Sequence, residues 1–502
     1  MLNNFISYLT ANKNKALLLL NLFFFLSIIV FIGYAFSKNR YMVVEEDEAI
    51  YYNSARLFSE TGSVRAFDCF DENTSKIGSS CWYGPMYSLL HGSIAKVAGL
   101  HKYNFLIFNL FCLALMILLV YRSGFTYTNK LLIILGFLTS VPCLYYLFSY
   151  YPVTLDLLFS TVLILQLKKL YDKDLKDEST TSTKIAFIAL ILFFATFRVA
   201  IVFWVFGLLP FTRSRKQFVQ TLLLSIGCLF LVLLYISFFN AAYHGFIMPV
   251  ILEHPFSPST YWQVVISFKN NFRNFFTQTP LLFAEYLFLL CISILSFILT
   301  KNKLVLSSCI IGLAYILILL SVYLYHPVFL NKLTAPLYPL LLVPIFYTGT
   351  PLIKKSTVLL LLLFSPTVYL ETFDQVQNHR WAYTFNNDLS YLTKPFQDLK
   401  YKLQGGKPIV VEGLYKEFED TIPYFIQMVN LPASTTDGYP ITYSNNFPDS
   451  TWKRTSYSSH FKKYGRLHID YILARHSITL DSITFVYSND LFYLYKNNKQ
   501  TK

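Results

Sequence analysis

The sequence predicts an α-helical, multi-pass membrane protein that carries a small α/β domain at its C-terminal end. Of its 502 residues, 54% are hydrophobic and 14% are charged, whereas soluble proteins carry about 25% charged residues. Residues 16–36 contain no charged side chain, and a transmembrane helix needs about 20 such residues. Residues 371–502 contain no comparable run. We therefore expect a membrane domain over residues 1–370 and a separate domain over residues 371–502.

Ten apolar runs follow one another along the membrane domain. They cover residues 16–36, 104–121, 131–150, 152–167, 185–211, 218–239, 281–299, 304–325, 333–347 and 356–370. Lys and Arg exceed Asp and Glu by 42 − 28 = 14 residues, and much of this excess lies in short loops between the runs. By the positive-inside rule these loops are cytoplasmic, and Lys13 and Lys15 place the N-terminus there too. The sequence shows no basic stripe together with an RNA- or DNA-binding motif, so we expect no nucleic acid as a partner.

The run over residues 185–211 decides the topology. As one helix it would be about 40 Å long, and it would put Arg213, Arg215 and Lys216 on the outer side. A hairpin of two short arms, with Arg198 near its tip, keeps these residues inside. Each arm is about 20 Å long, so the tip stops part-way and must be surrounded by protein or water. This gives about eleven transmembrane or half-spanning helices in the plasma (inner) membrane and an extracytoplasmic C-terminal domain.

Two outer loops, residues 37–103 and 240–280, are large. The second contains "STYWQVVISFKNNFRNFF", whose aromatic and basic residues predict a helix lying in the membrane interface. The first contains Cys69 and Cys81, which can form a disulfide if the loop faces an oxidising compartment. In the C-terminal domain, "GKPIVVEGL" and "HIDYILA" predict strands, "KEFEDTIPYFIQMV" predicts a helix, and "SITFVYSNDLFYLYK" predicts a hairpin.

A block of four acids, "EEDE", directly follows the first apolar run. We expect a helix from about residue 46 to residue 59, capped by Gly62, in which Asp47, Tyr51 and Ala55 share one face. Acids in a first helical turn interact favourably with the helix dipole, so the block can be a solvated helix start. Alternatively, one of its carboxylates belongs to an active site. The spacing is not that of an EF-hand calcium loop.

Two ionisable residues lie inside apolar runs. Asp156 stands just inside the outer end of its run, and Arg198 interrupts another. A charged residue in a membrane segment costs about 2.5–3.5 kcal/mol at the centre and indicates a functional site by default. The structural alternatives are hydrogen bonding of Asp156 to nearby hydroxyls and snorkelling of Arg198 to lipid headgroups.

Two further segments combine proline with aromatic residues: "CWYGPMYSLLHGSIAKVAG", which includes Tyr83, and "YHPVFLNKLTAPLYP", which includes Lys332. Their structural alternatives are an interfacial helix and a kinked helix entry.

Taken in order, these features resemble the GT-C membrane glycosyltransferases, the superfamily of protein O-mannosyltransferases and the lipid A aminoarabinose transferase. The first two features are an Asp-Glu pair after the first span (Asp47 and Glu48) and a Pro-aromatic helix ("YGPMYSLL"). A Thr-x-Asp-like site that ends at Asp156 follows, and then a basic residue, Arg198, that interrupts a long apolar run. The last is a segment at the outer entry of a span that is similar to Arg-Tyr-x-x-Pro ("NKLTAPLYP"). The sequence departs from the family where Tyr83 stands for Lys and Lys332 for Arg. Phosphate contacts would then fall to Arg198, Lys332 or the loop 240–280.

The resemblance implies a GT-C-like fold and a sugar donor linked to polyprenyl phosphate, which transfers its sugar to a glycan, lipid or protein acceptor at the outer face. It implies catalysis by Asp47 as general base, with inversion, helped by Glu48. The residues expected to bind substrate are Asp156, Arg198, Tyr51, Tyr83, Lys332 and His254. No cofactor is certain, and a divalent metal stays open. The alternatives are an oligosaccharide ligase that uses a larger lipid-linked donor and a transporter or flippase of lipid-linked substrates.

Overall fold

The computed structural model divides the chain into two compact units. The first comprises Met1–Tyr41, Lys102–Phe239 and Ile247–Asn378, and the second comprises Met42–His101, Asn240–Phe246 and His379–Lys502. The structure describes residues 13–37, 51, 54–55, 58–59, 62, 64–66, 79–80, 85–99, 104–148, 152–243, 258–278, 280–322, 334–378, 409–412, 442–443, 471–474, 483–488 and 493–497.

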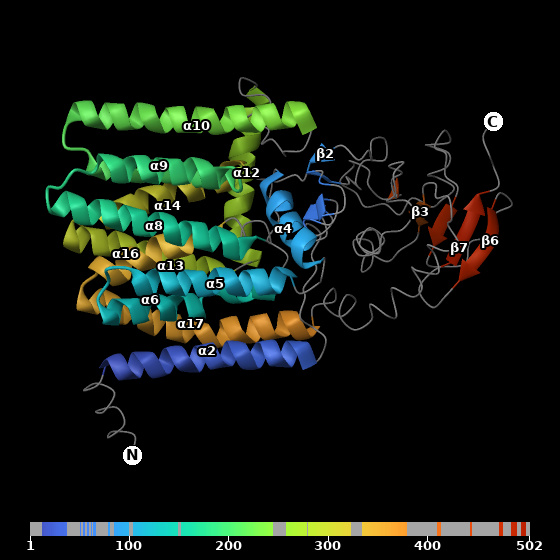
Figure 1. Ribbon diagram of the computed structural model, residues 1–502, viewed down its shortest axis with the longest axis horizontal. Coiled ribbons are helices and arrows are strands. Elements are labelled where there is room, and N and C mark those ends of the chain that lie inside the picture. Colours follow the sequence, from blue (N-terminus) through green and yellow to red (C-terminus); the bar gives the residue numbers. More distant parts are fainter. Residues whose placement is uncertain are drawn as a thin grey trace, which may run out of the picture. The chain divides into compact units, whose positions relative to one another are not determined.

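The first unit is a bundle of helices that run side by side, with α12 crossing them (Figure 1). Its elements are α2 (Lys13–Ser37), α5 (Asn104–Arg122), α6 (Tyr127–Thr139), α7 (Val141–Tyr145), η1 (Tyr146–Phe148), α8 (Val153–Leu175), α9 (Thr181–Ala195), η2 (Val199–Phe211), α10 (Arg215–Tyr243), α12 (Pro258–Gln278), α13 (Pro280–Thr300), α14 (Lys303–Val322), α16 (Leu337–Thr348) and α17 (Pro351–Asn378). Within the described residues, four helices are long and apolar enough to cross a membrane: Asn14–Tyr34, Asn104–Arg122, Arg215–Phe238 and Pro351–Leu370. The chain is therefore a multi-pass membrane protein.

Helices α8 and α16 form the centre of the bundle. Every residue of α16 from Leu337 to Phe346 is buried, as expected for a helix that is apolar all round. The outer helices instead expose large apolar side chains, such as Phe23 of α2 and Leu363 of α17. In a bilayer these side chains contact lipid tails, so no apolar surface is exposed to water and the exposure costs no hydrophobic free energy.

The apolar run over residues 131–150, expected as one span, is broken in the structure. Helix α6 ends at Thr139, and Ser140 takes an extended conformation while its Oγ accepts a hydrogen bond from the Cys143 N–H at 3.3 Å. Pro142 stands at the start of α7. Its ring lacks an N–H and would clash with the carbonyl group four residues earlier, which ends a helix. The single-span prediction was wrong because this proline was not used as a stop signal.

The run over residues 185–211 forms a hairpin, as predicted. Helix α9 ends at Ala195, Arg198 is extended (φ −135°, ψ 100°), and η2 packs back against α9. The second arm is a 3₁₀-helix of 13 residues, which rises about 2.0 Å per residue and so reaches about 26 Å. This arm is longer than the predicted 20 Å because 3₁₀ geometry stretches the same number of residues.

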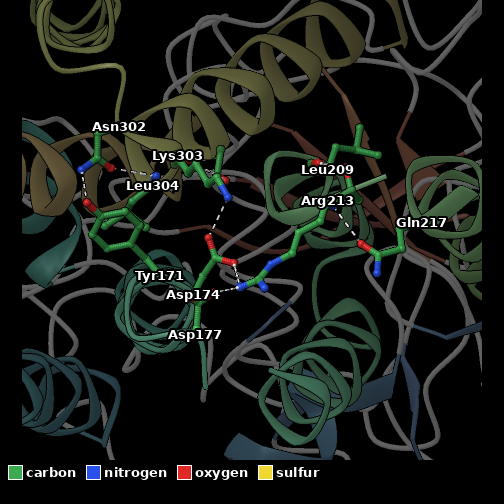
Figure 2. Close-up of polar contacts among 11 residues, drawn as sticks. Tyr171, Asp174, Asp177, Leu209, Arg213, Gln217, Asn302, Lys303 and Leu304 are labelled. Atoms are coloured by element: carbon green, nitrogen blue, oxygen red, sulfur yellow. Dashed lines mark hydrogen bonds and ion pairs between the residues drawn. The ribbon is translucent and has the colours of Figure 1, made fainter. Parts of the chain in front are cut away.

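Ion pairs at one end of the bundle confirm the relative topology that the hairpin implies. Asp174, near the end of α8, accepts hydrogen bonds from Lys303 Nζ at 2.7 Å and from Arg213 Nη2 at 3.2 Å (Figure 2). Arg213 also pairs with Asp177 at 2.8 Å. A single crossing by residues 185–211 would place both Arg213 and Lys303 at the end of the bundle opposite Asp174, and the two hydrogen bonds to Asp174 exclude that.

Replacing Asp174 by Asn should lower the free energy of unfolding by about 1 kcal/mol near neutral pH, since its cationic partners are half exposed. Burial alone would raise the pKa of Asp174, but hydrogen bonds from Lys303 and Arg213 outweigh burial and hold that pKa below its ordinary value. The stabilisation is therefore present above the pKa of the unfolded chain, about 3.9, and is lost as pH falls through the folded pKa. Thermal unfolding in detergent measures the effect. The exposed Asp177→Asn is the control, and an equal loss in both variants would contradict the buried pairing.

The second unit contains α4 (Pro85–Ala98), a short ladder of β1 (Arg65–Ala66) with β2 (Ser79–Ser80), and a five-stranded sheet. The strands are β3 (Ile409–Glu412), β4 (Thr442–Tyr443), β5 (Tyr471–Ala474), β6 (Ile483–Ser488) and β7 (Tyr493–Asn497), in the order β4-β3-β5-β7-β6. β3 is parallel to β4 and β5, and β7 is antiparallel to β5 and β6. Strands occur where the sequence predicts them. The predicted helix at residues 416–429 lies outside the described residues, so the α/β domain as a whole stays a prediction.

Candidate functional site

Asp156 and Arg198, which are 42 positions apart in sequence, form a buried ion pair in the first unit. The guanidinium donates to Asp156 Oδ2 from Nη2 at 2.6 Å and from Nε at 2.9 Å. The side chain of Asp156 is fully buried and that of Arg198 is 6% exposed. The snorkelling alternative is thus wrong for Arg198, because its charged end binds a carboxylate inside the protein.

Local backbone geometry places both partners. Asp156 lies in the first turn of α8, where its N–H donates to the Pro152 carbonyl at 3.0 Å and where the helix dipole favours a carboxylate. Arg198 lies between α9 and η2, with its own N–H bonded to the Phe194 carbonyl at 3.0 Å. The extended backbone at this residue carries the side chain out of the helical path and toward α8.

A second contact fixes the entry to α8. Thr154 Oγ1 donates to Asn109 Oδ1 at 2.5 Å. Asn109 Nδ2 in turn donates to the carbonyl oxygens of Tyr146 and Leu147, at 3.3 and 3.2 Å. Helix α5 is thereby tied to η1 and to the turn that precedes Asp156. This arrangement limits the movement of the Asp156 carboxylate.

The face of α8 that carries Asp156 also contacts the segment "NKLTAPLYP". Ser160, one turn after Asp156, donates its Oγ hydrogen to the Pro336 carbonyl. Two residues later, the Tyr338 hydroxyl donates to Glu285 Oε1 of α13 at 2.7 Å. Both side chains of this last pair are fully buried. We call Arg198, Asp156, Ser160, Pro336, Tyr338 and Glu285 the buried polar network.

This network joins three of the motifs that carry the resemblance: the Thr-x-Asp-like site, the basic residue of the hairpin and the segment "NKLTAPLYP". The network and the neighbouring Thr154–Asn109 contact also add residues that the sequence did not single out. Glu285 is an acid inside an apolar run, so the rule that selected Asp156 could have found it. Asn109 and Ser160 carry no such signal, because their partners become visible only in the folded chain.

In the second unit, a helical turn containing Tyr51, Ser54 and Ala55 buries these side chains. The ring of Tyr51 meets that of Tyr87 of α4 edge-on, with centroids 5.6 Å apart. The predicted cap is confirmed: Gly62 has φ +72°, and its N–H donates to the Phe58 carbonyl at 2.8 Å. The face that Tyr51 shares with Ala55 is therefore an inward face.

His91 of α4 gives this packing a defined response to acid. Burial lowers the pKa of His91 to about 3, whereas an unfolded chain has a His pKa of about 6.5. Between these values only the unfolded chain binds the proton, so stability falls with falling pH by up to about 1.4 kcal/mol per unit. His91→Gln should reduce the drop in the unfolding midpoint between pH 7 and pH 5. An unchanged drop would show that His91 does not carry it.

Five of the expected site residues lie outside the described residues: Asp47, Glu48, Tyr83, Lys332 and His254. Cys69 and Cys81 do as well. Among the residues that the structure describes, no three His, Cys, Asp or Glu side chains gather as a metal site.

The fold and its buried ion pair define a multi-pass membrane protein with a charged pair inside its helical bundle. The crystal structure of ArnT from Cupriavidus metallidurans bound to undecaprenyl phosphate is similar to this chain, with a TM-score of 0.53 and 10% identity over 94% of this chain and 98% of that chain. The apo state of the same protein gives a TM-score of 0.49 at 10% identity, over 93% and 97% of the two chains. No family model and no curated protein matches the sequence. The comparison therefore establishes the fold.

Proposed function

We propose that this protein is a glycosyltransferase that moves a sugar from a polyprenyl-phosphate donor to an acceptor at the outer face of the membrane. The main supporting observation is the Asp156–Arg198 pair of the buried polar network, in a fold similar to that of ArnT. The similar ArnT structure contains undecaprenyl phosphate, a lipid of the expected donor class.

Arg198 is assigned to the donor phosphate. A guanidinium has five N–H donors in a rigid fork and suits phosphate oxygens through paired, charge-assisted bonds. Its two bonds to Asp156 Oδ2 come from Nε and Nη2. A donor phosphate would compete with the Asp156 carboxylate for the Arg198 guanidinium. Asp156 thus orients the guanidinium, and Lys332, two positions before Thr334, supplies a second cation.

Asp47 is assigned as the general base. It removes the proton from the acceptor hydroxyl as that oxygen attacks the anomeric carbon from the side opposite the phosphate. The new glycosidic bond forms while the bond from the anomeric carbon to the phosphate oxygen breaks, so the configuration inverts and polyprenyl phosphate leaves. A phosphate needs little protonation, so one carboxylate suffices, unlike the acid and base pair of glycosidases. On the predicted helix, Asp47 lies one turn before Tyr51, on the face that Tyr51 and Ala55 bury.

The wild-type reaction is the first test. Membranes containing the protein are supplied with polyprenyl-phosphate sugars labelled in the sugar, and labelled product and free polyprenyl phosphate are measured together. Equal amounts of both products support transfer. Movement of intact donor across the membrane without transfer would favour the transporter alternative. Transfer only from donors that carry a longer glycan would favour the ligase.

Gly92→Ala should reduce transfer about tenfold or more, because displacement of a catalytic group by about 1 Å can cost that much or more. A Cβ at Gly92 would lie 2.6 Å from Phe58 Cβ, so the helical turn that contains Phe58 must shift. The proposed base precedes this turn on the same predicted helix. Gly227→Ala is the matched control, since a Cβ there meets nothing within 4 Å. Equal losses of transfer in both variants would contradict the explanation that Gly92→Ala acts by displacing this helical turn.

A further inference from the structure

Helix α12 crosses the other helices of the first unit and packs on α13 and α14 (Figure 1). Two residues after it ends, α13 begins at Pro280 and soon reaches Glu285, which binds Tyr338 near the start of α16. Helix α12 therefore lies at the end of the bundle where the buried polar network is found. The helices that are long and apolar enough to span a membrane run along the bundle axis, so we take this axis as the membrane normal, and a helix that crosses the bundle then lies close to the membrane plane.

The two faces of α12 are reversed relative to a helix on a soluble protein. Asn271 is 1% exposed, so a polar side chain faces the bundle. The outward side carries large apolar residues, of which Trp262 is 66% exposed and Phe272 is 47% exposed. Apolar surface gathered in this way needs a covering partner. In a multi-pass membrane protein, the outer boundary of the bilayer supplies one for a helix lying in the membrane plane.

Two cationic residues share this outward side. Trp262, Ile266, Lys269 and Arg273 follow one another at spacings of four, three and four residues, which places them on one helical stripe. Lys269 and Arg273 are both exposed. Long basic side chains can bury their stems in apolar surroundings while their charges reach the headgroup layer. The phosphates of anionic phospholipids are the complementary groups at that depth.

We propose that α12 is a binding surface for anionic phospholipid headgroups, with Trp262 and Phe272 inserted at the acyl boundary and with Lys269 and Arg273 on the lipid phosphates. Each basic residue near an anionic surface enriches such lipids about fivefold at low salt, or about 1 kcal/mol. This binding does not depend on the proposed reaction, so it can be measured without any sugar donor.

The test uses the full-length protein in vesicles that contain phosphatidylcholine and an equal fraction of either brominated phosphatidylglycerol or brominated phosphatidylcholine. Bromine quenches nearby tryptophan, and subtracting the signal of Trp262→Phe isolates the contribution of Trp262. We expect quenching by the anionic lipid to exceed quenching by the neutral lipid about twofold or more, given the enrichment per basic residue. The difference should vanish as ionic strength rises from about 0.01 M to about 1 M, where the Debye length falls from about 30 to about 3 Å.

The double variant Lys269→Gln/Arg273→Gln should quench equally with both lipids. The matched control Arg215→Gln/Lys216→Gln removes two exposed cations at the other end of the bundle and should keep the preference. No quenching of Trp262 by either lipid would show that α12 lies outside the bilayer. Equal quenching in the wild type, or a preference that survives in the double variant, would equally overturn the proposal.

Discussion

Asp47→Asn is expected to lower the rate constant of sugar transfer by about 10²–10⁴-fold, the usual contribution of a general base. Asparagine has nearly the same size as aspartate but cannot accept the proton of the acceptor hydroxyl. Because proton removal occurs only in the transition state, kcat should fall while KM for the donor changes little. Initial rates with labelled donor, measured at several donor concentrations, separate the two constants.

Two neighbouring acids provide the controls for this substitution. Glu45→Gln removes a charge from the same acid block at a position assigned only to the start of the helix, and it should retain near wild-type transfer. Glu48→Gln should give an intermediate loss, because Glu48 is proposed to assist Asp47. Equal losses for Glu45→Gln and Asp47→Asn would assign the effect to the charge of the block as a whole.

Arg198→Gln is expected to damage both folding and donor binding. Removing one partner of a buried ion pair leaves the Asp156 carboxylate without its guanidinium, which costs about 3–5 kcal/mol of stability. The same change removes the cation assigned to the donor phosphate. We therefore expect a lower unfolding midpoint together with loss of polyprenyl-phosphate binding, measured as the absence of thermal stabilisation by the added lipid.

The double variant Arg198→Gln/Asp156→Asn separates these two effects. It removes both charges, so much of the lost stability should return, since neutral replacements of buried pairs are often tolerated. Binding of polyprenyl phosphate should not return, because no guanidinium is restored. A double variant that binds the lipid as the wild type does would show that Arg198 is only a structural partner of Asp156.

The sequence predicted the elements whose signals are rare or local. A charged residue inside an apolar run is costly, so Asp156 and Arg198 could be selected without any structure, and the structure pairs them. Gly62 could be identified as a helix cap because glycine readily takes the left-handed conformation in which many helices end. Gly62 has that conformation in the structure. The hairpin was predicted because it places the basic loops before and after residues 185–211 on the same side of the membrane. The bonds that Arg213 and Lys303 both make to Asp174 support this placement.

Other features depended on contacts that the sequence does not encode locally. The bond from Thr154 to Asn109 joins helices whose packing follows from the whole bundle. Glu285 carried the same membrane signal as Asp156 but lay outside the motifs under comparison. The 3₁₀ geometry of η2 has no clear sequence signature, because the run is uniformly apolar and its periodicity does not distinguish the two helix types.

One measurement tests the proposed function most directly: binding of labelled donor and release of its sugar, followed in the same sample for three proteins. The wild type should bind the polyprenyl-phosphate sugar and transfer the sugar. Asp47→Asn should bind it and leave the sugar on the lipid, and Arg198→Gln/Asp156→Asn should do neither. Transfer by Asp47→Asn at the wild-type rate, or unchanged binding by the double variant, would contradict the assigned roles.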